Sequence, residues 1–156
     1  MKKSIKDFTI MQVVLVLAFC LLVIVSNETE QKYTKGLCIL LSCLIVSCIH
    51  EIGHFFTAMI NKIPICGMGF ELRWIVLRAY TKVNLKGVSK SKIIFFYLGG
   101  TIGTGILLLI LILLNVIYKI DFEYVKVIAF SSIMINIIPI YKNDGYYILK
   151  YINNNN

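Results

Sequence analysis

Apolar residues in this chain come in long uninterrupted blocks, not at the spacing typical of a soluble helix or strand. The blocks cover residues 8–25, 37–60, 93–118 and 125–141. A helix needs about 20 mainly apolar residues to cross a bilayer, and the first three blocks reach or approach that length. The fourth is short and contains Pro139, which we expect to kink or end its helix. The pattern predicts a mainly α-helical membrane protein with about four transmembrane helices.

The segment between the second and third blocks has a different pattern. Apolar side chains there alternate along the chain in two sets: Phe70, Leu72, Trp74 and Val76, then Val83 and Leu85. A period of two is typical of β-strands, so we predict a short β-hairpin at the cytoplasmic membrane interface. An irregular basic loop held by anionic lipid headgroups is the alternative.

Composition and charge support the membrane assignment. Of the 156 residues, 58% are hydrophobic, too many for a soluble domain of this size. The net charge of +8 comes from lysines and arginines in the connections between blocks, which argues against nucleic-acid binding. Positive charge flanking membrane spans marks the cytoplasmic side. We therefore expect a multi-pass protein of the cell membrane with both termini and the middle loop in the cytoplasm.

The ends of the chain complete this organisation. The first block has a basic start but is longer than a signal-peptide core and lacks a small-residue cleavage site, so we expect a retained span. Residues 1–152 are predicted to form a single polytopic domain, and the asparagine-rich residues 153–156 a disordered tail.

The second block contains the residues that carry chemistry. His50, Glu51 and His54 form an HExxH motif, and these are the only two histidines in the chain. On a helix, residues four apart share a face, so both imidazoles can bind one Zn²⁺. The intervening glutamate is placed to activate water. Such side chains are costly at membrane depth, and a metal ion offsets that cost. Two polar residues that only hold helices together are the alternative.

A hydrolytic zinc site usually takes three protein ligands, so a third must be found. Descending from the outer side, His50 and His54 lie about 20 and 26 Å along their helix, and Asp144 lies about 28 Å below the start of the last block, beyond its end. This depth favours Asp144 as the third ligand. Glu71, in the middle loop, remains the rival.

Two ordered motifs give the chain a family resemblance. HEIGH in an apolar helix, followed by NIIPIYKNDG with Asn136, Pro139 and Asp144, resembles the site-2 protease family of intramembrane zinc metalloproteases. The resemblance covers roughly residues 37–150. The chain departs from the family at LGGTIGTG, residues 98–105, where many members carry a Gly-Pro and a nearby Asn. We interpret these glycines as helix-packing positions, with a role in substrate gating as the alternative.

The resemblance implies a role for each matching residue. His50, His54 and Asp144 would bind zinc, Glu51 would be the general base, and Asn136 would lie near the substrate or the oxyanion. The hairpin would hold an unwound substrate as an added strand.

The expected function is an intramembrane zinc endopeptidase. It would cleave a membrane-embedded peptide or single-span protein close to the cytoplasmic side of the bilayer. One alternative is a non-catalytic binding or self-protection protein with a structural zinc site. Another is a zinc protease whose third ligand is a glutamate, acting on loops outside the membrane.

Overall fold

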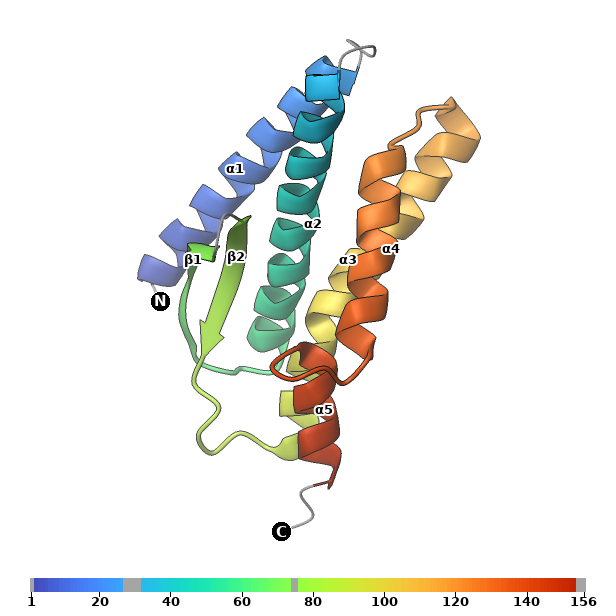
Figure 1. The fold of residues 1–156 in the computed structure, drawn as a ribbon. Coiled ribbons are helices and arrows are strands. Elements are labelled where there is room, and N and C mark those ends of the chain that lie inside the picture. Colours follow the sequence, from blue (N-terminus) through green and yellow to red (C-terminus); the bar gives the residue numbers. More distant parts are fainter. Residues whose placement is uncertain (1, 27–31, 74–75, 154–156) are drawn as a thin grey trace.

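The computed structural model describes residues 2–26, 32–73 and 76–153, and this part of the chain is mainly helical (Figure 1). In chain order the elements are α1 (Lys2–Ser26), α2 (Lys32–Ile60), β1 (Ile65–Arg73), β2 (Val76–Val83), α3 (Lys90–Tyr118), α4 (Glu123–Ile137) and α5 (Asp144–Asn153). The predicted mainly α-helical class with one short β-hairpin is confirmed for these residues.

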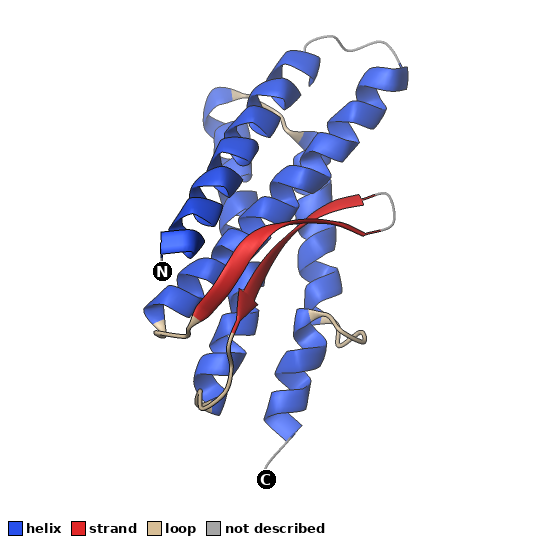
Figure 2. Cartoon of the chain, turned by 90° about the vertical axis from the view of Figure 1, so that its left-hand side faces the viewer, coloured by secondary structure: helices blue, strands red, loops and turns tan. Residues whose placement is uncertain are grey.

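The four longer helices run alternately up and down beside one another (Figure 1). The N-terminus, the connection from α2 into the hairpin, and α5 all lie toward the same end of this bundle. The hairpin folds back from the end of α2 and lies across α1 and α2 (Figure 2). This arrangement places α5 and the HExxH part of α2 at one end of the molecule.

Within the described residues, two helices are long and apolar enough to cross a membrane: α2 from Lys35 to Ile60, and α3. Helix α1 contains a shorter apolar stretch, Phe8–Ile24. Helix α4 has 15 residues and is about 22 Å long, short of the roughly 30 Å hydrocarbon core. It ends at Ile137, as expected ahead of Pro139, because a residue before proline avoids the helical conformation. The prediction of four spans thus remains a prediction.

The two alternating sets of apolar residues do not correspond to the two strands of the hairpin. Arg73, the last residue of β1, pairs with Val76, the first residue of β2, and Trp74 and residue 75 lie outside the described residues. Phe70 and Val76 therefore lie on different strands, although the alternation groups them in one set. The period of two runs through both arms of the hairpin and does not mark the short turn between them.

The predicted disordered tail also needs a correction at its start. Asn153 is the last residue of α5, since the helix continues to the end of the described chain. Residues 154–156 of that tail lie outside the described residues.

A central apolar core joins the four longer helices. Its fully or almost fully buried members are Ala18, Leu22, Cys38, Leu41, Ile45, Val46, Leu111, Val125 and Ala129. A second cluster joins the hairpin to α1 and α2 through Met11, Cys48, Phe55, Met68 and Ala79. The hairpin is thus packed onto the helices.

Large apolar side chains such as Leu17, Leu109 and Val116 are more than half exposed, and the exposed positions cover the outer faces of α1 and α3.

Helices α2 and α3 approach each other closely next to the HExxH motif. A Cβ atom on Gly53 would lie 2.2 Å from the carbonyl oxygen of Gly99, which no side chain could tolerate. Small residues permit such close contact between membrane helices. The predicted packing role of the glycine-rich segment is therefore visible at Gly99, and α3 lies directly against the face of α2 that carries the histidines.

Candidate metal centre

Three side chains from two helices converge at one end of the bundle. His50 and His54 lie one turn apart on α2, and their Nε2 atoms are 3.2 Å apart. Asp144, the first residue of α5, reaches them from a segment 94 residues away from His50. Its Oδ2 atom lies 2.9 Å from Nε2 of His50 and 3.3 Å from Nε2 of His54. The structure therefore brings together the three predicted zinc ligands.

The spacing of these three atoms suits a tetrahedral ion. Zinc bound to imidazole nitrogen and carboxylate oxygen at about 2.0–2.2 Å separates its ligand atoms by about 3.3 Å. The three observed separations, 2.9, 3.2 and 3.3 Å, are close to that value. Two nitrogens and one oxygen are also a donor set typical of hydrolytic zinc enzymes, which leave the fourth position free. The residues present fit Zn²⁺.

A second grouping of donors competes with this one. The ligand atoms of His50, Glu51 and His54 all lie within 4.8 Å of one another, so Glu51 could in principle complete a metal site. The carboxylate oxygen of Asp144 lies closer, at hydrogen-bond distance from both histidine nitrogens. We therefore take Asp144 as the better third donor, which leaves the Glu51 carboxylate beside the site but outside the ligand set.

Both histidines are held from behind by α3. Nδ1 of His54 lies 2.8 Å from the backbone oxygen of Phe96, to which it donates. Nδ1 of His50 lies 3.3 Å from Oγ1 of Thr104. A metal-binding histidine typically uses its second nitrogen in this way, and the hydrogen bond fixes the ring orientation and the tautomer. Both rings thus direct Nε2 toward Asp144.

Gly100 lies between these two outer partners and makes room for the rings. A Cβ atom at this position would lie 2.4 Å from Nε2 of His50 and 2.5 Å from Nε2 of His54. Phe96, Gly100 and Thr104 are spaced four residues apart, so they form one face of α3. This face matches the two histidines, which are also four residues apart on α2.

The position of Asp144 depends on the residues that flank it. The side-chain amide of Asn143 donates to the backbone oxygens of Ile135 and Ile138, both at 2.6 Å. Its carbonyl oxygen accepts the backbone N–H of Tyr146 at 2.9 Å, as an N-cap does. Gly145 is buried, and a Cβ there would lie 2.5 Å from the backbone oxygen of Ile137. One short segment thus ties α5 to the end of α4.

The charge state of Asp144 follows from its surroundings. Burial alone would raise the pKa of this carboxyl, but hydrogen bonds with His50 and His54 outweigh burial and lower the pKa below its usual range. The carboxylate is therefore the form present near neutral pH, which is the form that binds a metal.

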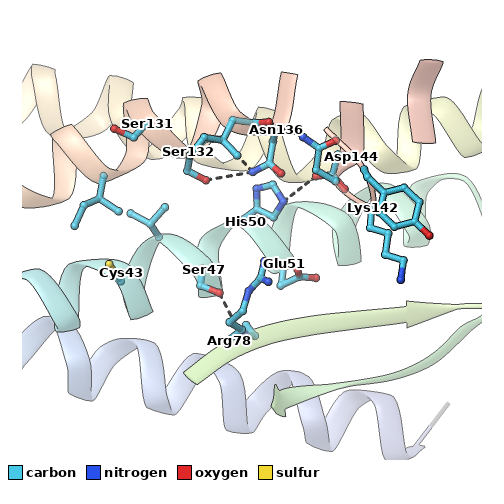
Figure 3. A pocket seen from close by; sticks show the side chains of 16 residues that line it. Cys43, Ser47, His50, Glu51, Arg78, Ser131, Ser132, Asn136, Lys142 and Asp144 are labelled. Atoms are coloured by element: carbon cyan, nitrogen blue, oxygen red, sulfur yellow. Dashed lines mark hydrogen bonds and ion pairs between the residues drawn. The ribbon is translucent and has the colours of Figure 1, made fainter. Parts of the chain in front are cut away.

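A cleft of about 720 Å³ opens beside the three donors, between α2, β2, α4 and the segment before α5 (Figure 3). His50, Glu51 and Asp144 form part of its wall, with Asn136 on the α4 side and Arg78 on the β2 side. Serine hydroxyls add to its polar character: Ser47, Ser131 and Ser132. In a molecule with so apolar an exterior, this polar cleft is a route by which water can reach the site.

The two remaining predicted residues, Asn136 and Glu71, lie in different parts of the structure. Asn136 lines the cleft as expected, and its amide also donates to the backbone oxygen of Ser132 at 3.0 Å. Glu71, the rival third ligand, lies exposed on β1 opposite Arg78 and is not part of the cleft wall. The geometry therefore favours Asp144 over Glu71.

Sequence reasoning did not identify Phe96, Thr104 and Asn143. A signal was present for Thr104, because a threonine four residues after Gly100 repeats the spacing of the HExxH histidines. The Phe96 contact uses a backbone oxygen, which leaves no trace in the sequence. Asn143 precedes Asp144 as an N-cap residue would, which is a weak signal.

Comparisons of the chain with protein-family models, with curated proteins and with solved structures find no match. The functional argument therefore rests on the geometry of the site.

Proposed function

We propose that this protein is an intramembrane zinc endopeptidase of the site-2 protease type. The observation that carries the proposal is the triangle formed by His50, His54 and Asp144, with the carboxylate of Glu51 beside it at a polar cleft. Two helices long and apolar enough to cross a bilayer carry most of this arrangement. A structural site has no need for the extra carboxylate or for the cleft.

The chemistry divides between the ion and the protein. When bound by His50, His54 and Asp144, zinc supplies Lewis-acid activation of water and of the scissile carbonyl. Glu51 takes the proton from the attacking water and passes it to the leaving amine nitrogen. Its position next to His50 on the cleft wall suits that task. Asn136, which also lines the cleft, would lie near the substrate or the oxyanion.

The substrate we propose is a membrane-embedded peptide or a single-span protein, cleaved close to the cytoplasmic side. A transmembrane helix hides its peptide bonds, so the substrate must unwind before it enters the cleft. Strand β2 forms one wall there through Arg78 and Ala79. The backbone N–H of Ala79 points away from β1 and bonds to Ser47 Oγ at 3.1 Å. An extended peptide that adds here as a further strand would take the Ala79 N–H from the Ser47 hydroxyl.

We further propose a multi-pass arrangement with both termini in the cytoplasm. The N-terminus, α5 and the metal centre lie toward one end of the bundle (Figure 1), and lysines and arginines concentrate in the segments at that end. The positive-inside tendency assigns that end to the cytoplasm. The exposed apolar side chains on α1 and α3 would face lipid.

The decisive experiment compares zinc content and cleavage in three forms of the detergent-purified protein. We expect about one zinc per chain in the wild type and in Glu51→Gln, and depletion in Asp144→Ala, because only the last removes a ligand. Of these three forms, only the wild type should cleave a single-span reporter in proteoliposomes. Glu71→Gln is the matched control and should behave as wild type. Absence of zinc from the wild type, or full activity in Glu51→Gln, would contradict the proposal.

A further inference from the structure

The face of α3 that lies behind the two histidines holds them in different ways. His54 bonds to a backbone oxygen, which any residue at position 96 would supply. His50 bonds to the hydroxyl of Thr104, which only the side chain supplies. We propose that Thr104 is a positioning residue that sets the tautomer of His50 and so determines the affinity of the metal site. This inference rests on the proposed zinc centre.

The hydrogen-bond roles follow from what each atom can do. The hydroxyl of Thr104 donates its single proton to the backbone oxygen of Gly100 at 3.0 Å, because a carbonyl can only accept. Its oxygen is then left to accept, and Nδ1 of His50 at 3.3 Å is the donor available to it. A proton on Nδ1 keeps Nε2 free of one, and the lone pair on Nε2 is what binds a metal.

Burial makes the Thr104 contact hard to replace. Thr104 is 0% exposed, so water does not reach its hydroxyl. With Oγ1 removed, Nδ1 of His50 would lose its acceptor in a dry environment, which is unfavourable. The ring would gain by rotating or by moving its proton to Nε2, and either change removes a ligand from the site. Gly100, directly below the rings, has no side chain that could take over.

The test measures the affinity of the purified protein for Zn²⁺ by competition with a chromophoric chelator, without reference to catalysis. Thr104→Val keeps the shape of the side chain and removes the acceptor, and we expect affinity about 10- to 100-fold below wild type. Thr104→Ser restores the hydroxyl and should bind within a few-fold of wild type.

Ser42→Ala is the matched control for lost packing. Ser42 is also 0% exposed and also donates to the backbone oxygen four residues earlier, but it contacts no histidine. Loss of affinity in Thr104→Val alone, with recovery in Thr104→Ser, supports the inference. Equal zinc affinity in Thr104→Val and wild type overturns it and leaves the proposed function standing. An equal loss in Ser42→Ala, with lower thermal stability of both metal-free variants, also overturns it. A wild type that binds no zinc overturns both proposals.

Discussion

The two sides of the metal centre are built in different ways. On one side, α3 faces His50 and His54 along a continuous helical surface, with Gly100 between Phe96 and Thr104. On the other side, Asp144 is the first residue of α5 and follows the short connection from α4. The first side is fixed by the packing of two long helices, whereas the second depends on local hydrogen bonds. A disruptive substitution on the α3 side should therefore displace two ligands at once, and one on the α5 side should displace only one.

The largest effect is expected from Gly100→Ala, which attacks the α3 side. Its methyl group would clash with both Nε2 atoms, since the ideal Cβ is 2.4 and 2.5 Å from them. Either the rings must turn or the helices must separate, and overpacking of this kind costs about 1–3 kcal/mol. We expect zinc content close to zero in the purified variant, together with a lower thermal midpoint.

Gly105→Ala provides the control on the same helix. A Cβ at this position meets nothing within 4 Å, so alanine should bind zinc normally. Alanine is also favoured over glycine within a helix by about 0.5–1 kcal/mol, so the free energy of unfolding should rise slightly. Normal zinc binding in Gly100→Ala would show that α3 does not confine the histidines.

An intermediate effect is expected from Gly145→Ala, which attacks the α5 side. The added methyl group would lie 2.5 Å from the backbone oxygen of Ile137 and 2.8 Å from that of Asn136. The start of α5 must move away from α4, and Asp144 moves with it. Because both histidines remain in place, we expect weakened zinc binding and not its abolition, measurable by chelator competition. Complete loss of zinc, equal to that in Gly100→Ala, would contradict the distinction between the two sides.

The same contrast explains which features could be read from the sequence. The histidine pair is local, four residues apart on one helix, and its motif predicts the convergence directly. Asp144 could be selected because the depth of each block restricts which acids can meet the histidines. The hydrogen bond from His54 to Phe96 and the narrow space at Gly100 could not be predicted, since both depend on the position of α3 along the axis of α2. That relative position is set by tertiary packing, which no pattern in one helix encodes.

The smallest effect is expected from Asn143→Ala. This change removes two hydrogen bonds to the end of α4 and the N-cap of α5, but it leaves Asp144 and Gly145 in place. Loss of a cap costs about 0.5–2 kcal/mol, and part of that should appear as looser positioning of Asp144. We expect zinc affinity reduced by less than in Gly145→Ala.

Asn115→Ala separates this effect from a general loss of stability. Asn115, near the end of α3, also donates from its side-chain amide to a backbone oxygen, that of Ile120 at 3.4 Å, but it is not one of the residues of the metal centre. If Asn143 acts by holding Asp144, only its replacement should weaken zinc binding, and Asn143→Asp should recover the N-cap but not the bonds to α4. Equal zinc affinity in both alanine variants would mean that the turn positions Asp144 without this side chain, through the close contact of Gly145 with α4.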